Sequence, residues 1–137
     1  MQDCVVLVDV CKRAGDTPRS KWGYGLYLRS DGQQQNYYEF IIQSGGQFQI
    51  GKGIGGKYMK LASFTKSDAL KTGHGQWNAL KVSALGNTLS FYANGQLLKT
   101  VRDDSIRMGK VGLFAVDAHD SAKPDTVEFR NVRVMKP

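Results

Sequence analysis

Alternation with a period of two runs through almost the whole chain, and it restricts the fold more than any other feature of the sequence. Within Tyr37–Gln43, for example, Tyr38, Phe40 and Ile42 fall on one side of an extended strand, away from their sequence neighbours. Helical periodicity is nearly absent, since only residues 65–71 could form a helical turn. The pattern therefore predicts an all-β protein whose strands each bury one face.

Short runs of this kind recur along the chain and are separated by turn residues. They cover residues 5–10, 22–29, 37–43, 47–50, 77–83, 88–93, 96–101, 109–116 and 126–134. Gly45 and Gly46 separate two of these runs. Asn94 followed by Gly95 is the strongest hairpin signal, because a type I′ turn needs two positive φ angles. About ten strands at this spacing predict a single antiparallel β-sandwich domain over residues 1–137.

The composition is that of one folded globular domain. The chain has 137 residues, of which 41% are hydrophobic and 23% are charged, and these values exclude an intrinsically disordered chain. No apolar stretch approaches the roughly 18 residues of a membrane-spanning helix, so no membrane span is expected. Cys4 and Cys11 lie about 20 Å apart along one expected strand, which excludes a disulfide between them.

The chain is basic, with 19 Lys and Arg against 12 Asp and Glu and a formal net charge of +7. These basic residues are scattered along the sequence, and neither a ribonucleoprotein-like motif nor a helix-turn-helix pattern is present. We therefore expect no nucleic-acid partner. The charge instead favours an anionic glycan or cell-wall polymer.

Four motifs in the second half of the chain suggest a family: Trp77-Asn-Ala-Leu-Lys-Val, Gly86-Asn-Thr-Leu-Ser-Phe-Tyr-Ala-Asn-Gly, Gly109-Lys-Val-Gly-Leu-Phe-Ala and Val127-Glu-Phe-Arg-Asn-Val-Arg-Val. With them, the chain from Val5 to Val134 resembles the concanavalin A-like (lectin/glucanase) jelly rolls. Within these it is most similar to the bacterial 3-keto-disaccharide hydrolase (DUF1080) domains and to related carbohydrate-binding, lectin-like and laminin G-like modules. The Trp77 side chain is expected to close the core.

The resemblance implies an exported protein, extracellular or periplasmic, although the N-terminus of this chain does not have the pattern of a signal peptide. Complete members of the group usually open with one or two further strands before the segment that matches residues 5–10, and these strands are missing here. The chain would then be a domain of a larger protein, a variant with a circularly different strand order, or a subunit whose open sheet edge is covered by a neighbour, as in a homo-oligomer.

Catalytic carboxylates of the kind found in retaining glucanases of this fold are not expected. Those enzymes carry an E-x-D-x-x-E strand motif that places two carboxyl groups about 5 Å apart, and the motif does not occur in this sequence. Asp9 and Glu39 each stand alone in an expected strand, and no G-x-S-x-G nucleophile motif is present. The sequence therefore predicts no catalytic residue, while the question whether the protein is an enzyme stays open.

Two loop segments have weak alternative interpretations. Asp117, His119 and Asp120 could ligate calcium, but a solvated loop is favoured, and no cofactor or metal is predicted. The glycine-rich residues 51–56 resemble a phosphate-binding loop only in composition, because they precede a strand instead of opening a helix. We interpret them as a glycine-rich hairpin turn.

One strand face combines aromatic rings with planar polar groups, which is what sugar binding requires. In jelly rolls of this class ligands lie on the concave sheet face, so we expect the binding residues there: Tyr27, Arg29, Tyr37, Glu39, Gln47 and Gln49, with Trp22 as a platform at the rim. The alternative is an ordinary solvated sheet face on which Arg29 and Glu39 form a cross-strand ion pair.

The sequence thus favours a non-catalytic carbohydrate-binding module, part of a larger or oligomeric exported protein, that holds a poly- or oligosaccharide. Two alternatives remain at this stage. One is a glycoside hydrolase of the 3-keto-disaccharide type that uses the same face. The other is a structural protein-interaction domain that associates through a sheet edge.

Overall fold

The computed structural model describes residues 3–14, 23–115 and 126–137. These residues form ten β-strands: β1 (Cys4–Ala14), β2 (Tyr24–Ser30), β3 (Tyr37–Gln43), β4 (Gln47–Ile54), β5 (Lys57–Lys66), β6 (Trp77–Leu85), β7 (Thr88–Ala93), β8 (Gln96–Arg102), β9 (Lys110–Ala115) and β10 (Thr126–Met135). No helix long and apolar enough to cross a membrane occurs among them.

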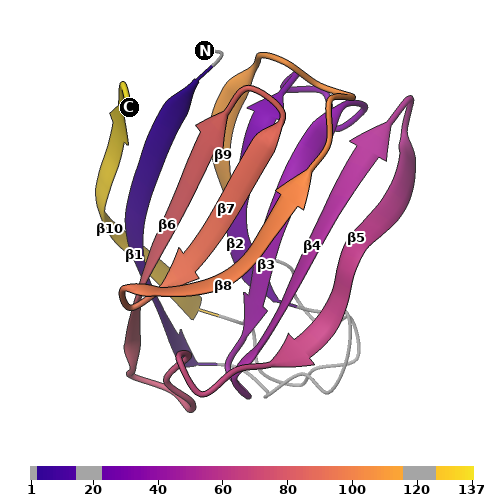
Figure 1. Cartoon of the computed structure of the whole chain (residues 1–137). Coiled ribbons are helices and arrows are strands. Elements are labelled where there is room, and N and C mark those ends of the chain that lie inside the picture. The colour runs from indigo at the N-terminus through magenta and orange to yellow at the C-terminus, as the bar shows by residue number, and fades with distance from the viewer. Residues whose placement is uncertain (1–2, 15–22, 116–125) are drawn as a thin grey trace.

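The strands form two five-stranded antiparallel sheets that stack face to face (Figure 1). One sheet has the order β10-β1-β6-β7-β8 and the other has the order β5-β4-β3-β2-β9. We call these the β1 sheet and the β2 sheet. The predicted all-β sandwich of about ten strands is confirmed.

The core lies between the two sheets and takes one residue in two from each inner strand. Val6, Val8 and Val10 of β1 face Leu26 and Leu28 of β2 from the opposite sheet, and all five are at most 1% exposed. The aromatic side chains of β3 and β7 meet in the middle, where the rings of Phe40 and Phe91 lie 5.1 Å apart edge to face. The period of two in the sequence thus translates directly into burial on one face of each sheet.

Hairpins form at Asn94–Gly95, as predicted, and at Gly45–Gly46, and each has the backbone that its turn residues favour. Asn94 and Gly95 have φ angles of 51° and 82°, the pair of positive values that a type I′ turn requires. Gly46 has a φ angle of 87°, and its amide donates to the carbonyl oxygen of Gln43 at 3.0 Å.

Strand β5 is the strand expected after the glycine-rich residues 51–56, but no period-two run predicted its bounds or its outward residues. This strand lies at an edge of the β2 sheet, pairs only with β4 among the described strands, and leaves most of its residues exposed. This edge strand carries lysines at both ends, and only Leu61 and Ala62 in its middle pack against the core, so the period-two signal is lost. Residues 65–71, where a helical turn was considered, are not helical: β5 includes residues 65 and 66, and a turn follows.

The Trp77 side chain does not close the core, contrary to expectation. Trp77 is half-buried and pairs with Cys11 in the β1 sheet. The guanidinium groups of Arg130 and Arg13 lie 3.7 Å and 5.4 Å from its ring centroid. The cation–π contacts with two arginines thus hold the ring outside the hydrophobic cluster. Cys4 and Cys11 are both buried free thiols.

Candidate functional site

The candidate site occupies the outer face of the β2 sheet, the face turned away from the core. Strand pairing places Tyr27 opposite Glu39, and Glu39 opposite Gly51 on the next strand. Their sequence neighbours, such as Leu26 and Phe40, are fully buried in the core, which sets the direction of the outer side chains. The structure therefore brings Tyr27, Tyr37 and Glu39 together on one face, as the sequence predicted.

Three aromatic rings make a continuous row across this face. Tyr27 stacks on Phe114 of β9 with ring centroids 4.6 Å apart and an interplanar angle of 24°. Tyr27 also meets Tyr37 of β3 edge to face at 5.0 Å. These ring–ring contacts stabilise the row and hold the three rings in fixed orientations.

Glycines in β4 make room for two of the tyrosine rings on the face. A Cβ atom at Gly51 would overlap the hydroxyl end of Tyr58, and a Cβ atom at Gly53 would overlap the ring of Tyr37. The rings therefore lie over bare backbone. The hairpin turn predicted in residues 51–56 is confined to Gly55 and Gly56, because Gly51 and Gly53 belong to the strand and support the rings.

A short hydrogen-bond chain supplies the polar centre of the site. The Tyr58 hydroxyl donates to Glu39 Oε1 at 2.9 Å and accepts from Gln49 Nε2 at 2.9 Å. Gln49 is 5% exposed, and its Oε1 atom has no hydrogen-bond partner within the described part of the chain. A buried acceptor of this kind is costly unless a donor reaches it. The site therefore offers one acceptor that the protein leaves unpaired.

Partial burial shifts the acid–base properties of these groups. Burial raises the pKa of Glu39, and the hydrogen bond from Tyr58 offsets part of this rise. Burial, together with the nearby Glu39 charge, raises the pKa of Tyr27 to about 12. Burial likewise raises the pKa of Tyr37. At neutral pH the tyrosines are thus neutral hydroxyl groups, which can both donate and accept hydrogen bonds.

Arg29 does not lie on this face, which corrects the prediction that it shares a face with Tyr27. Its φ angle is +48°, and the pairing of β2 with β9 shifts register between Tyr27 and Ser30. This irregularity reverses the alternation and sends the side chain toward the β1 sheet. No lysine or arginine in the described segments forms an ion pair with Glu39, so the alternative Arg29–Glu39 pair is also wrong.

The Arg29 side chain instead braces one end of the sandwich. It is 2% exposed, and its Nη1 atom donates to the carbonyl oxygens of Gly86 at 2.7 Å and Ile106 at 3.1 Å. Its Nη2 atom lies 3.5 Å from Asp3 Oδ1. Asp3 in turn accepts the Gly86 amide at 2.9 Å. Arg29 therefore ties three segments together and takes no part in the outer face.

The remaining predicted residues have mixed outcomes. Gln49 joins the Tyr58 chain, whereas Gln47 lies at the start of β4, paired with Gln43 beside the hairpin turn. Trp22, the expected rim platform, lies outside the described residues. So do the loop residues Asp117, His119 and Asp120 considered for calcium. The described residues contain no group of three or more His, Cys, Asp or Glu side chains that could hold a metal ion.

Sequence reasoning missed two members of the face, Tyr58 and Phe114. Tyr58 belongs to β5, whose residues and outward face the sequence patterns did not predict. Phe114 lies in a segment that was predicted as a strand. Because side chains alternate along a strand, and Leu113 is on the core side of β9, Phe114 points outward. For Phe114 the missing information is the pairing of β9 with β2, two strands that are distant in the sequence. For Tyr58 it is the missing alternation in β5, which follows β4 directly across a short turn.

Solved structures of the same fold include proteins named for carbohydrate binding. A carbohydrate binding module, CBM66 from Bacillus subtilis, is 19% identical with a TM-score of 0.74, covering 99% of this chain and 76% of that one. Sheep galectin-11 is 15% identical with a TM-score of 0.61, covering 95% of this chain and 91% of that one. The GH43 protein BlXynB from Bacillus licheniformis is 15% identical with a TM-score of 0.66, covering 100% of this chain but 28% of that one.

The ten-stranded sandwich is thus a concanavalin A-like jelly roll, like these structures. More specifically, residues 2–135 match the model of the 3-keto-alpha-glucoside-1,2-lyase-like domain, and the chain belongs to that family. Both findings confirm the resemblance inferred from the sequence motifs. No curated protein matches the sequence.

Proposed function

We propose that the protein binds a poly- or oligosaccharide, without catalysis, on the outer face of the β2 sheet. The observation that carries the proposal is the row of Phe114, Tyr27 and Tyr37 beside the Tyr58–Glu39–Gln49 hydrogen-bond chain. Aromatic rings can stack on the apolar faces of sugar rings, while the carboxylate and amide groups bind hydroxyls. The similarity in fold to a carbohydrate binding module and to galectins supports this assignment.

The glycines under the rings make the face suitable for an extended ligand. Because Gly51 and Gly53 carry no side chains, Tyr58 and Tyr37 lie along the sheet. The rings keep intermediate or larger exposure, with Tyr58 40% exposed. A preorganised surface loses little conformational entropy when a ligand binds. The unpaired Gln49 Oε1 atom marks a position where a ligand hydroxyl group or a water molecule could donate.

The test is a glycan array followed by isothermal titration calorimetry with the glycan that binds best. Tyr37→Ala should weaken binding at least about tenfold, equivalent to roughly 1.4 kcal/mol. Tyr58→Phe, which removes a single hydroxyl group, should also weaken it. The matched control is Tyr92→Ala in the β1 sheet, where Tyr92 contacts Lys81. Absence of binding across the array, or equal affinity in Tyr37→Ala and the parent protein, would overturn the proposal.

A second candidate is a lyase acting on 3-keto-glucosides, and the family match favours it. In such an elimination a base removes the proton on C2, acidified by the C3 ketone, and the substituent on C1 leaves with its bonding electrons. Glu39 is the carboxyl group on this face whose pKa burial raises, and the Tyr58 hydroxyl lies 2.9 Å from it. These two groups could serve as base and proton donor.

The two functions separate in one assay. Release of the C1 substituent from a 3-keto-disaccharide, lost in Glu39→Gln but retained in Tyr92→Ala, would support the lyase. Glycan binding that persists without any turnover of 3-keto-glucosides would leave the binding module as the function.

A further inference from the structure

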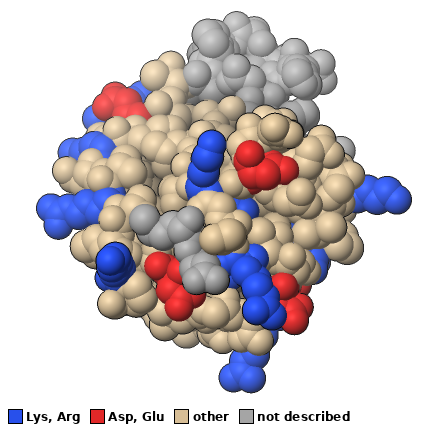
Figure 2. Space-filling view, turned by 90° about the horizontal axis from the view of Figure 1, so that it is seen from above, with Lys and Arg blue, Asp and Glu red and all other residues tan. Residues whose placement is uncertain are grey.

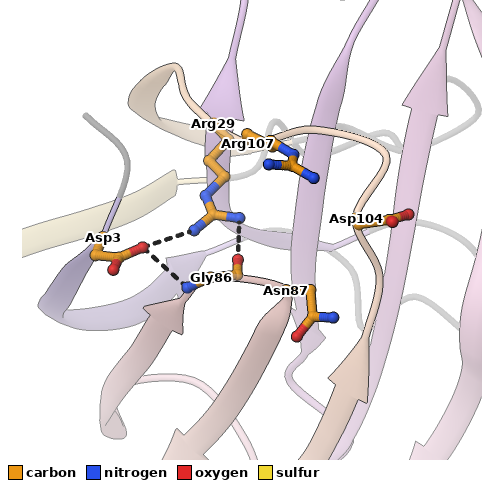
Figure 3. A pocket seen from close by; sticks show the side chains of 6 residues that line it. All are labelled: Asp3, Arg29, Gly86, Asn87, Asp104 and Arg107. Carbon is orange, nitrogen blue, oxygen red and sulfur yellow. Dashed lines mark hydrogen bonds and ion pairs between the residues drawn. The ribbon is translucent and has the colours of Figure 1, made fainter.

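The outer face of the β2 sheet with Phe114, Tyr27 and Tyr37 is called the aromatic face below. A pocket separate from it lies at the end of the sandwich where β2 ends and β6 turns into β7, at the top of Figure 1. Its volume is about 340 Å³, and six residues line it: Asp3, Arg29, Gly86, Asn87, Asp104 and Arg107 (Figure 3). We propose that this pocket binds one neutral sugar unit through its hydroxyl groups, independently of the aromatic face. A pocket of this volume is large enough for a small ligand.

Buried polar contacts hold the floor and one wall of the pocket in place. The Arg29 guanidinium forms the floor, and its bonds to Gly86 and Ile106 connect the β6–β7 turn to the loop before β9. Asp3 accepts the Gly86 amide and lies beside Arg29, as the dashed lines in Figure 3 show. The pocket therefore exists before any ligand arrives, which favours binding.

The opposite wall is the β8–β9 loop, and Asp103 anchors it. Asp103 accepts hydrogen bonds from Tyr38 and Lys52, both at 2.6 Å, and its side chain is 12% exposed. Its backbone amide donates to the Asn87 carbonyl oxygen at 2.8 Å, which joins the two walls directly. Burial raises the Asp103 pKa, but the bonds from Lys52 and Tyr38 lower it well below its ordinary value. This carboxylate therefore stays charged and holds the loop at neutral pH.

The lining side chains that have free hydrogen-bonding groups are suited to bind the hydroxyl groups of a ligand. Asp104 and Arg107 are exposed, and no hydrogen bond or ion pair joins either to another described residue. Among the described residues, the Asn87 amide nitrogen donates to no other group, and its side-chain oxygen accepts the Thr88 hydroxyl at 3.3 Å. The pocket thus presents a carboxylate acceptor, a guanidinium donor and an amide donor. A sugar hydroxyl both donates and accepts, and therefore matches this mixture.

Charge balance decides between a neutral and an anionic ligand. Asp3 compensates Arg29 at 3.5 Å, and the lining holds one further acid, Asp104, and one further base, Arg107. Viewed from above, basic and acidic side chains are interspersed at this end of the molecule and form no continuous basic patch (Figure 2). A phosphate or carboxylate would meet as many negative as positive groups. No aromatic ring lines the pocket, so the sugar is held by its edge, not by stacking.

The test is a titration followed by ¹H–¹⁵N correlation spectra, with D-glucose, D-galactose, D-mannose and D-fructose as probes up to about 100 mM, because single-sugar sites are weak. At least one sugar should shift the amide signals of Asn87, Asp104 and Arg107. The shift of the Asn87 amide should disappear in an Asp104→Ala, Arg107→Ala double variant, which removes the hydrogen-bonding groups of both side chains. Both side chains are exposed, so the variant should keep the parent's spectrum elsewhere.

The outcomes separate this pocket from the aromatic face. Tyr37→Ala should abolish any shifts on the aromatic face and leave the pocket signals responsive. Pocket shifts without any response of Glu39 or Gln49 would uphold the pocket as an independent site for a single sugar, while the calorimetric test with oligosaccharides decides on the aromatic face. The proposal is wrong if no probe shifts the pocket amides, or if the shift of the Asn87 amide persists in the double variant. Stronger shifts with inorganic phosphate than with any sugar would also refute it.

Discussion

Replacement of Arg29 by methionine tests whether this buried guanidinium braces the two sheets. Methionine keeps the unbranched shape of the side chain but removes every donor. The positive φ angle of +48° at this position remains in the variant, so backbone strain contributes equally to both proteins. The change therefore removes the bonds to Gly86, Ile106 and Asp3 without altering the backbone preference at this position.

The expected loss follows from the surroundings of each partner. Asp3 has a half-exposed side chain and Gly86 is in an exposed turn, so both can regain water when Arg29 is removed. Ile106 is 9% exposed, and a buried carbonyl oxygen left without a donor costs about 1–3 kcal/mol. Loss of the charge-assisted bonds adds to this cost. We expect Arg29→Met to lower the free energy of unfolding by about 2–4 kcal/mol.

The measurement is urea denaturation monitored by intrinsic fluorescence and circular dichroism, with the slope of the transition compared between variants. Arg107→Met is the matched control, because Arg107 is exposed and lies at the same pocket. It should change the free energy of unfolding by no more than about 0.5 kcal/mol. If the two variants lose equally little stability, the bracing role assigned to Arg29 is refuted.

Three further predictions concern the anchored loop, the aromatic face and the cysteines. Asp103→Asn should lower the free energy of unfolding by about 2 kcal/mol at neutral pH. Because the pKa of Asp103 is depressed in the folded protein, this difference between variant and parent should shrink as pH falls from about 5 to about 2, as measured by urea denaturation at each pH. A cost that does not change with pH would argue against the charged anchor. Gly51→Ala should displace the Tyr58 hydroxyl and weaken glycan binding in calorimetry, while lowering stability by less than about 1 kcal/mol, and unchanged affinity would contradict the role of the ring. Cys4 and Cys11 should react with a thiol reagent only as fast as the protein unfolds, whereas rapid reaction under native conditions would show that they are accessible.

Local patterns were sufficient where a residue's role depends on its immediate neighbours in the chain. The core side of β3 and the Asn94–Gly95 turn follow from alternation and turn chemistry alone. The grouping of Tyr27, Tyr37 and Glu39 was also predictable, because it required only that two consecutive strands pair across a short connection.

Long-range pairing lay beyond those patterns. Phe114 reaches Tyr27 because β9 joins β2 from the far end of the chain. No local signal specifies which edge a late strand will take, since the choice depends on the surface that the folded sheets leave open. Tyr58 is a separate case, because β5 pairs with β4 across a short turn, but the sequence of β5 shows no clean alternation that would set its outward residues.

The alternation of side chains was enough to determine an all-β sandwich and its buried face, because burial on one side of a strand requires a period of two. Arg29 shows where that argument ends. One irregular backbone position reversed its side chain from the outer face to the gap between the sheets. Its carbonyl partners come from segments 57 and 77 residues away. Only the tertiary structure could decide this, because a buried guanidinium is stable only where the folded chain brings acceptors around it.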